Sequence, residues 1–294
     1  MTMIPFSKMV GAGNDFIIVD ARRHRLPRLP WPAVSRALCD RRRGVGADGL
    51  LVLEPSAVAA ATMRVFNPDG SEAQMCGNGA RCVALYEATR NRQHATRKSL
   101  VTIETKAGVL SGRVRGEQVV MRMTDPTNLT LGLAVPVSGR RLRLGCVNTG
   151  VPHAVVRVSA LDRVDVLGLG RALRRHRRFA PRGTNVDFIQ PAGRADRLRI
   201  RTYERGVEGE TLACGTGVAA SAIIHTLSRP GRVNGQARRH RVDVETRSGD
   251  HLAVSFSVSP TPGGPRVTEV TLEGTARHAF DGTAAWPMER HGWH

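Results

Sequence analysis

The 294-residue sequence lacks several sequence features, and the absence of each argues against a class of protein. No apolar run approaches the roughly 20 residues that cross a membrane. The first residues, MTMIPFSKMVGAGNDF, lack the apolar stretch of a signal peptide. The five cysteines are an odd number in a long chain, which argues against a disulfide framework. We therefore expect a globular protein of the reducing cytoplasm, long enough for two domains.

Lysine and aromatic residues are also scarce. Only Lys8, Lys98 and Lys106 are lysines among the 44 basic residues, and aromatic residues are 4% of a chain with a formal net charge of +19. A nucleic-acid-binding protein would need aromatic side chains among the basic ones to stack on bases. The arginine excess therefore indicates a compositional bias. The densest basic run, RALRRHRRFAPRG (171–183), is predicted to be a helix with a solvated face.

Cofactor and metal motifs are missing from the sequence as well. It has no HExxH, no cluster of Cys and His, and no GxGxxG after a strand. Cys76 and Cys82 are separated by five residues and have no partner pair, which is not typical of zinc sites. We therefore expect no cofactor and no metal. A basic nucleic-acid-binding protein and a thiol redox protein stay open as alternatives from a different class.

What the sequence does contain is an internal repeat. TMRVFNPDGSEAQMCGNG surrounds Cys76 and RIRTYERGVEGETLACGTG surrounds Cys214, and both end in Glu-x-x-x-Cys-Gly-x-Gly. Downstream, VTIETKAGVL (101–110) matches VDVETRSGDHL (242–252). Upstream, GNDFIIVD near residue 14 resembles TNVDFIQP near residue 185. Matched blocks in matched order predict a duplicated unit.

The repeat predicts the fold class. Alternating segments such as RVDVETRSG and VTEVTLEG predict strands with one buried face. VAASAIIHTL, after Cys214, carries no charge and predicts a helix that is buried on all sides, and ARCVALYEATR, after Cys76, is nearly as apolar. We expect an α+β fold of two pseudo-symmetric domains. Each is a mostly antiparallel sheet wrapped around a central helix, with the active site in the cleft between the domains.

A boundary between the two domains is predicted from turn formers. TDPTNLTLGLAVPV (124–137) has no helical period, so residues 1–124 form the first domain and residues 125–274 the second. The tail AAWPMERHGWH shows no pattern and is predicted to be loose.

The two Cys-Gly turns indicate the chemistry. Glycines after a cysteine let the backbone aim N–H groups outward at a helix start, where an anion binds and the pKa of a thiol falls from about 8.5 toward neutrality. A lone cysteine beside glycines is more often a small buried apolar residue, but the duplicated context favours a catalytic pair. The cysteines without such turns are interpreted as structural: Cys39, Cys82 and Cys146.

Two opposed sulfurs suit the inversion of a stereocentre. A thiolate removes a proton from one face of a carbon, and a thiol delivers a proton to the opposite face. Two helix N-termini aimed at an α-carboxylate would stabilise the carbanion that forms. A redox disulfide between Cys76 and Cys214 is physically possible, although the sequence has no C-x-x-C motif.

At these residues the sequence resembles the diaminopimelate epimerase family, cofactor-independent enzymes of lysine and peptidoglycan precursor synthesis. The resemblance rests on KMVGAGNDFIIVD, GVGADGLL, FNPDGSEAQMCGNGARC, NTGVPHAVV, GTNVDFI and YERGVEGETLACGTG, and it extends to about residue 283. It implies epimerisation of LL- to meso-2,6-diaminopimelate with Cys76 and Cys214 as the two bases. It also implies a homodimer, and a last strand near EVTLEGTARHAF that returns, over about 275–294, to the first domain.

The resemblance also implies the roles of other residues. It implies that substrate is bound by Asn14, Asn67, Asn185, Glu204 and Arg205, and by the backbone N–H groups of Gly77–Asn78 and Gly215–Thr216. His153 and Glu204 would tune the thiol pKa values. Asparagines and an arginine suit the distal end of an amino acid zwitterion because they supply no competing base. Asparagine is also a common turn residue, so each has a structural interpretation too.

Two positions depart from the family pattern. Many relatives have a glutamine where this chain has Gly49, and many have an asparagine where it has Val151. An amino acid racemase or epimerase of the same fold, acting on hydroxyproline, proline or histidine, is the nearest alternative. Proline-type relatives tend to have histidine in place of Asn78, so Asn78 with Glu204 and Arg205 favours diaminopimelate.

Overall fold

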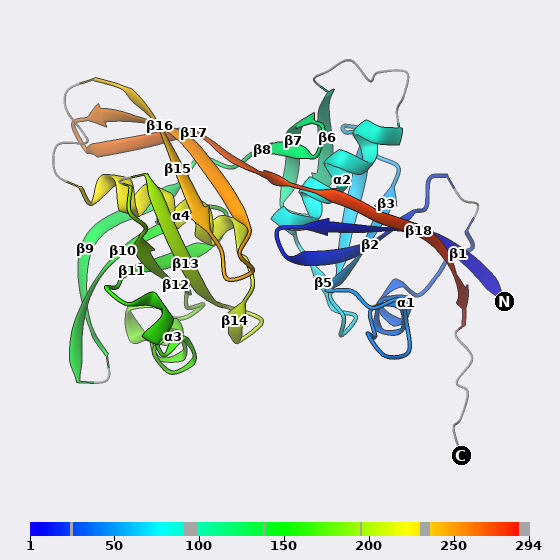
Figure 1. Cartoon of the computed structure of the whole chain (residues 1–294), viewed down its shortest axis with the longest axis horizontal. Helices are drawn as coiled ribbons and strands as arrows, with labels where there is room; N and C mark the ends of the chain where they lie inside the picture. The colour runs from blue at the N-terminus through cyan, green and yellow to red at the C-terminus, as the bar shows by residue number, and fades with distance from the viewer. Residues whose placement is uncertain (24–25, 91–98, 138, 195, 230–235, 288–294) are drawn as a thin grey trace. The chain divides into compact units, whose positions relative to one another are not determined.

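The structure is a computed structural model, which describes residues 1–23, 26–90, 99–137, 139–194, 196–229 and 236–287. It divides into two compact units, Met1–Met121 with Thr275–His294, and Arg122–Gly274. Figure 1 shows that each unit is built mainly of strands with a helix among them. Among the described residues, no helix is both long and apolar enough to cross a membrane.

The first unit is a sheet around one helix. Its elements are β1 (Thr2–Gly11), β2 (Asn14–Asp20), α1 (Trp31–Leu38), β3 (Gly49–Glu54), β4 (Ala61–Phe66), β5 (Glu72–Ala73), α2 (Gly77–Arg90), β6 (Ser99–Thr105), β7 (Gly108–Arg115), β8 (Gln118–Arg122) and β18 (Arg277–Trp286). Strands β2 and β3 pair in parallel, as do β4 and β6, while β18–β1, β1–β2, β3–β4, β4–β5 and β6–β7 pair antiparallel. Helix α2 contacts β1, β2, β4, β6, β7 and β18, so it is the central helix of this unit.

The second unit repeats this plan. Its elements are β9 (Thr127–Val137), β10 (Arg140–Asn148), β11 (Pro152–Arg157), the 3-10 turn η2 (Leu161–Arg163), α3 (Val166–Arg174), the 3-10 turn η3 (Arg177–Phe179), β12 (Asn185–Pro191), β13 (Arg197–Glu204), β14 (Gly209–Thr211), α4 (Gly215–Leu227), β15 (Arg238–Glu245), β16 (His251–Thr261) and β17 (Gly264–Thr275). Parallel pairs are β11–β12 and β13–β15; β9–β10, β10–β11, β12–β13, β13–β14, β15–β16 and β16–β17 are antiparallel. Helix α4 contacts β10 to β13, β15 and β16.

The two pairing patterns confirm the duplicated α+β fold. Strands β1 to β7 correspond in order to β10 to β16, and α1 and α2 correspond to α3 and α4. One matched block is nevertheless wrong. GNDFIIVD lies on β2, the counterpart of β11, whereas TNVDFIQP lies on β12, the counterpart of β3. The two segments share a short Asp-Phe pattern, but strand position is decided by hydrogen-bonded partners and not by that pattern.

In the first unit, the sheet is covered on both faces at strand β3. On β3, Leu51 and Leu53 pack in the core around α2, and Leu50 and Val52 pack in the core that includes α1. This alternation explains why GLLVLE is a continuous apolar run, since a strand buried on both faces needs apolar residues throughout. The second unit packs α3 against β12 and β13 in the same way.

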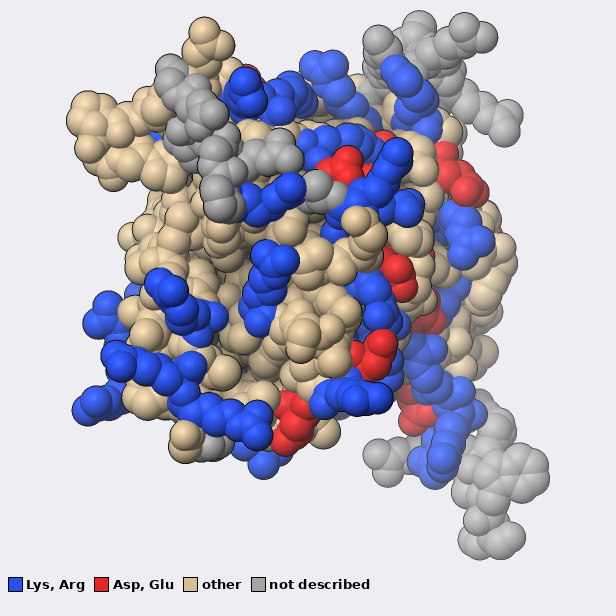
Figure 2. Space-filling model, turned by 60° about the vertical axis from the view of Figure 1, so that its left-hand side comes forward, with Lys and Arg blue, Asp and Glu red and all other residues tan. Residues whose placement is uncertain are grey.

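Two sequence predictions about helices have different outcomes. Helix α4 is buried on all sides from Thr216 to Leu227, as its lack of charge predicted. The predicted basic helix over residues 171–183 is wrong, because α3 ends at Arg174 and only the 3-10 turn η3 follows. Leu173 is the last buried residue of α3, and the polar residues beyond it offer no face to pack. Figure 2 shows Lys and Arg side chains spread over the visible face with acidic residues between them.

Strands occupy parts of two connecting segments, and they correct the prediction of a loose tail. The domain boundary predicted between residues 124 and 125 lies between β8 and β9, and most of residues 124–137 form the long strand β9. The start of the tail is also ordered, because Ala284, Ala285 and Trp286 belong to β18 and pair with β1. Trp286 packs against the core around α1, which explains its order. Residues 288–294 of the tail lie outside the described residues.

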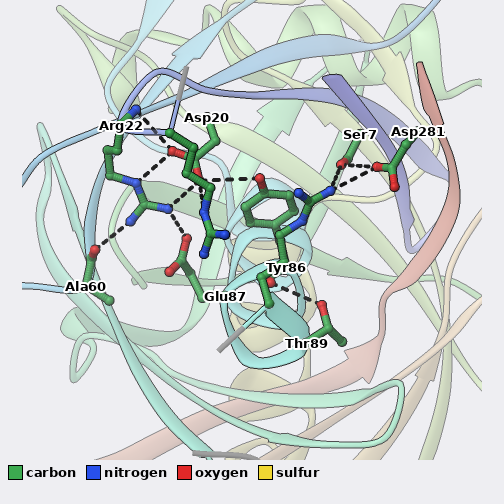
Figure 3. A network of polar contacts seen from close by, with 10 residues as sticks. Ser7, Asp20, Arg22, Ala60, Tyr86, Glu87, Thr89 and Asp281 are labelled. Carbon is green, nitrogen blue, oxygen red and sulfur yellow. Dashed lines mark hydrogen bonds and ion pairs between the residues drawn. The ribbon is translucent and has the colours of Figure 1, made fainter. Parts of the chain in front are cut away.

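A polar network ties β2, α2 and β18 together in the first unit (Figure 3). The guanidinium of Arg22 forms ion pairs with Asp20 and Glu87, whose side chains are 1% and 4% exposed. Tyr86 also donates a hydrogen bond to Asp20 at 3.3 Å. Burial alone would raise the pKa of Asp20, but the hydrogen bond and charge of Arg22 outweigh it and hold that pKa below its ordinary value.

Candidate active site

Cys76 stands directly before α2 in the first unit. Its carbonyl accepts the N–H of Ala80 at 2.8 Å, and the backbone N–H of Gly79 points at its Sγ at 3.4 Å. A Cβ on Gly77 would meet no atom within 4 Å, so this turn has open space beside it. The half-buried sulfur therefore lies where helix N–H groups favour a negative charge.

Two of the predicted asparagines lie together beside this turn. The side chain of Asn78 donates to the Oδ1 of Asn14 at 2.6 Å and accepts from the buried guanidinium of Arg81 at 2.7 Å. Asn14 in turn donates to the Oδ2 of Asp48 at 2.9 Å. This chain of hydrogen bonds fixes both amide groups without adding a free base to the site.

Asn67 is not part of this hydrogen-bonded chain. It is exposed in the loop after β4, where its side chain donates to the hydroxyl of Ser71 at 2.9 Å. The glutamates of the repeated layout have a structural role, because Glu72 pairs with Arg64 and Glu210 pairs with Arg201 on the neighbouring strand. The hydrogen bond from Arg64 lowers the pKa of Glu72 to about 2. Both ion pairs hold the short strand before the cysteine turn.

Cys214 is the N-cap residue of α4 and is 8% exposed. Its carbonyl accepts the N–H of Val218 at 2.9 Å, and its Sγ lies 3.4 Å from the hydroxyl of Thr216. The hydroxyl of Thr149 donates to the carbonyl of Thr216 at 2.8 Å and stabilises the turn. This turn is therefore the counterpart of the one at Cys76.

His153 connects this turn to a buried carboxylate. Its Nε2 is 2.9 Å from the hydroxyl of Thr216, and its Nδ1 is 2.7 Å from Asp187, with both side chains of that ion pair 0% exposed. The hydroxyl of Thr202 donates to the other oxygen of Asp187 at 2.8 Å. A continuous line of polar contacts thus runs from Cys214 to β13.

The remaining predicted residues of the second unit surround this line. The Oδ1 of Asn185 accepts the N–H of Arg205 at 2.7 Å, and its Nδ2 is 3.4 Å from Nε2 of His153. Glu204 lies close enough to Cys214 to act on its charge, and burial raises the pKa of Glu204. The structure therefore brings Cys214, Thr216, His153 and Asn185 into one hydrogen-bonded group.

The expected fall of the thiol pKa is wrong for Cys214. Burial raises its pKa well above the ordinary value, and the negative charges of Glu204 and Asp187 add to this. The hydrogen bond from the N–H of Gly217 acts in the opposite direction but does not overcome burial. A thiol at this position is held as the protonated acid.

The other cysteines are buried or half-buried away from glycine turns. Burial raises the pKa of Cys39, that of Cys82 to about 12 and that of Cys146 to about 11. These thiols are poor nucleophiles and poor metal ligands. Among the described residues, no group of three or more His, Cys, Asp or Glu is arranged to hold a metal ion.

The two departures from the family pattern, Gly49 and Val151, have mainly backbone and apolar surroundings. A Cβ on Gly49 would lie 3.2 Å from the carbonyl oxygen of Phe66 and 3.4 Å from the ring of Phe16, so a side chain here needs small shifts. Val151 is half-buried, and its carbonyl accepts the N–H of Thr149 at 3.2 Å. Neither position supplies a polar side chain.

Several residues of the site were missed by the sequence analysis, namely Asp48, Arg81, Thr149, Asp187 and Thr202. One signal was available for Asp187, because a charged residue in the middle of the apolar segment NVDFI needs a partner when that strand is buried. The others look like ordinary polar residues until the strands are placed.

Known proteins resemble this chain over most of its length. The family model described as diaminopimelate epimerase matches residues 6–129 and 145–260. A diaminopimelate epimerase of Aquifex aeolicus is 39% identical over 287 residues, covering 94% of this chain and 96% of that protein. One of Chlorobaculum tepidum is 40% identical over 276 residues, covering 94% and 99%.

Solved structures resemble the fold at low sequence identity. A hydroxyproline epimerase from Agrobacterium vitis superposes with a TM-score of 0.70 at 17% identity, covering 98% of this chain and 94% of that one. A PhzF-family phenazine biosynthesis protein from Bacillus anthracis gives a TM-score of 0.70 at 19% identity, covering 97% and 100%. At these identities the likeness extends to the fold alone.

Proposed function

This chain belongs to the diaminopimelate epimerase family, and from that premise we propose that it epimerises LL-2,6-diaminopimelate to meso-2,6-diaminopimelate without a cofactor. The observation that carries the proposal is the duplicated turn. Cys76 and Cys214 occupy equivalent positions at the starts of the two central helices, each with backbone N–H groups directed at its sulfur. Folding does not require a cysteine sulfur at either helix start.

The proposed mechanism uses one sulfur on each face of the substrate α-carbon. A thiolate at Cys76 or Cys214 removes the α-proton, and the other sulfur, as a thiol, gives a proton to the opposite face. The N–H groups of Gly77–Asn78 and Gly215–Thr216 would hold the α-carboxylate and stabilise the carbanion. Removing one such preorganised donor in other enzymes costs about 3–4 kcal/mol of transition-state stabilisation.

The distal end of the substrate would be bound by polar side chains of both units. The proposed set is Asn14, Asn67, Asn185, Glu204 and Arg205, with His153 and Glu204 adjusting the thiols. The ordered amides of Asn14 and Asn185 support this, because an amide held by neighbours can direct its remaining groups to an ammonium or carboxylate. A homodimer and a cytoplasmic location stay predictions, which light scattering and fractionation of cells would check.

Deuterium exchange tests the proposal directly. Purified protein incubated with LL-diaminopimelate in D2O should form the meso isomer with deuterium at the inverted carbon. Trans-4-hydroxy-L-proline is the matched control substrate, because a hydroxyproline epimerase shares the fold. Inversion of hydroxyproline but not of diaminopimelate would contradict the proposed substrate. Absence of deuterium in the meso product would contradict proton abstraction.

Single cysteine variants test the two-base mechanism. Cys76→Ala and Cys214→Ala should each lower epimerisation by about 10²- to 10⁴-fold, the loss expected for one acid–base group. With an analogue that has a good leaving group at Cβ, each variant should still catalyse elimination, because elimination needs only one sulfur. The two should prefer opposite stereoisomers. Near wild-type epimerisation by either variant would refute the mechanism.

A further inference from the structure

The second unit buries polar side chains where the first unit, built on the same plan, buries apolar ones. His153 pairs with Asn185 across the parallel strands β11 and β12, and Phe16 pairs with Gly49 across β2 and β3. His153 is therefore the counterpart of Phe16. Both are buried, at 1% and 4% exposure.

Strand β12 also buries a polar side chain where its counterpart β3 buries an apolar one. A Cβ on Gly217 would lie 2.5 Å from Oδ1 of Asp187, and a Cβ on the equivalent Gly79 would lie 3.1 Å from Cδ2 of Leu51. Asp187 and Leu51 thus occupy the same place, beneath the first turn of the central helix. Each is 0% exposed.

A third pair completes the comparison. Thr202 pairs with Asp187 on the neighbouring strand, and Val65 pairs with Leu51. The first unit shows that the plan folds with an apolar set at all three positions. Burying a carboxylate and an imidazole costs free energy that apolar side chains do not. The polar set is therefore not needed for folding, and its hydrogen bonds lead to Cys214.

The direction of these hydrogen bonds follows from their partners. An ionised carboxylate only accepts, so the contact of 2.7 Å with Asp187 places a proton on Nδ1 of His153. The amide of Asn185 is oriented because its Oδ1 accepts the N–H of Arg205, so its Nδ2 faces Nε2 of the imidazole as a donor. Nε2 is therefore an acceptor in a neutral ring.

The hydroxyl of Thr216 transmits this direction to the sulfur. With Nε2 as acceptor at 2.9 Å, the hydroxyl proton points to His153, and the hydroxyl oxygen is left to accept from the S–H of Cys214 at 3.4 Å. The charged or titratable groups around Cys214 are Glu204, Asp187 and His153. The two carboxylates likewise favour the uncharged thiol.

We propose that Asp187 is a positioning residue which, through His153 and the hydroxyl of Thr216, holds Cys214 as the thiol in the free protein. Cys214 then begins as the proton donor, and Cys76 begins as the base. The inference rests on the proposed two-cysteine function. When Cys214 protonates the substrate, its S–H bond breaks and the carbanion electron pair forms the Cα–H bond. The Thr216 hydroxyl can then turn its proton from Nε2 to the new thiolate.

Nitrogen-15 NMR of histidine side chains tests the first part. His153 in the wild-type protein, assigned by the signals lost in His153→Gln, should show the Nδ1–H tautomer. Asp187→Asn should change it to the Nε2–H tautomer, because Thr202 donates to Oδ1 and leaves the amide N–H₂ facing the ring. An Nε2–H tautomer or an imidazolium in wild-type protein at neutral pH would overturn the proposal, even if no variant folds.

A pH titration with ¹³Cβ-labelled cysteine tests the transmission through Thr216. Asp187→Asn should lower the titration midpoint of Cys214, because the hydroxyl then donates to the sulfur. In a Thr216→Val background, Asp187→Asn should lower the Cys214 midpoint by less than it does in the wild-type background. In a Thr216→Ser background, which keeps a hydroxyl, Asp187→Asn should lower the midpoint by the full amount again. An equal lowering with and without the hydroxyl would mean that Asp187 acts by its charge alone, and it would overturn the relay. The midpoint of Cys76 is the internal control.

A matched variant and an activity measurement separate this inference from the proposed function. Asp162→Asn also removes a carboxylate from the second unit, but Asp162 pairs with Arg199 at the surface, so it should leave the Cys214 midpoint unchanged. Thr216→Val should lower kcat by about 10- to 100-fold if one charge-assisted hydrogen bond is lost. Near wild-type epimerisation by Cys214→Ala would refute the function, whereas the tautomer and titration results concern the relay alone.

Discussion

Replacing Arg22 with methionine should destabilise the first unit strongly, because this guanidinium separates two buried carboxylates. Asp20 and Glu87 are 1% and 4% exposed, and both form ion pairs with Arg22 (Figure 3). Breaking a buried ion pair by removing one partner costs about 3–5 kcal/mol. Arg23 lies 3.1 Å from Asp20 and stays in place, so we expect the lower end, about 3 kcal/mol.

Urea unfolding followed by tryptophan fluorescence measures this loss. Trp31 and Trp286 lie in the first unit, and the second unit, Arg122–Gly274, contains no tryptophan, so tryptophan fluorescence follows the unfolding of the first unit. With a urea dependence of about 3 kcal/mol per molar, the midpoint should fall by about 1 M. Arg23→Met is the matched control. Arg23 is 43% exposed, and its loss should cost at most about 1 kcal/mol.

The difference between wild type and Arg22→Met should also depend on pH. Arg22 holds the pKa of Asp20 below its ordinary value, so the stability it contributes is present above the unfolded pKa and is lost as pH falls through the folded pKa. Without Arg22, burial raises the pKa of Asp20. The difference should therefore shrink between pH 7 and about pH 4. A loss below 1 kcal/mol, or a difference that is constant with pH, would refute this account.

Three further predictions concern the site. Gly217→Ala should abolish most epimerisation in a folded protein, because its Cβ would lie 2.5 Å from Asp187 and 3.2 Å from His153; circular dichroism and activity together check this. Epimerisation should survive dialysis against EDTA and treatment with hydroxylamine, and recovery only after addition of metal or pyridoxal phosphate would contradict the cofactor-free mechanism. Air oxidation that inactivates the protein reversibly should link the Cys76 and Cys214 peptides in mass spectra, and a bridge between other cysteines would argue against opposed sulfurs.

The duplicated fold could be predicted from the sequence because its signals are local. A helix buried on all sides needs an apolar segment without charges, and a sharp turn at a helix start needs glycine, so VAASAIIHTL and the two Cys-Gly turns are readable without the structure. The two cysteines of the candidate site were found through the same repeated blocks, whereas its asparagines were named by the resemblance to the family.

Correspondence between the two units was decided only by strand pairing. A segment such as NVDFI is compatible with several strands of either unit, and only its register opposite His153 and Thr202 shows where Asp187 lies. The difference between Asp187 and Leu51 is likewise invisible until the two strands are aligned through their partners. The protonation of Cys214 depends on burial and on the charges of Asp187 on β12 and Glu204 on β13, residues distant from Cys214 in the chain. Electrostatic energies depend on distance and desolvation, and both are set by the tertiary structure.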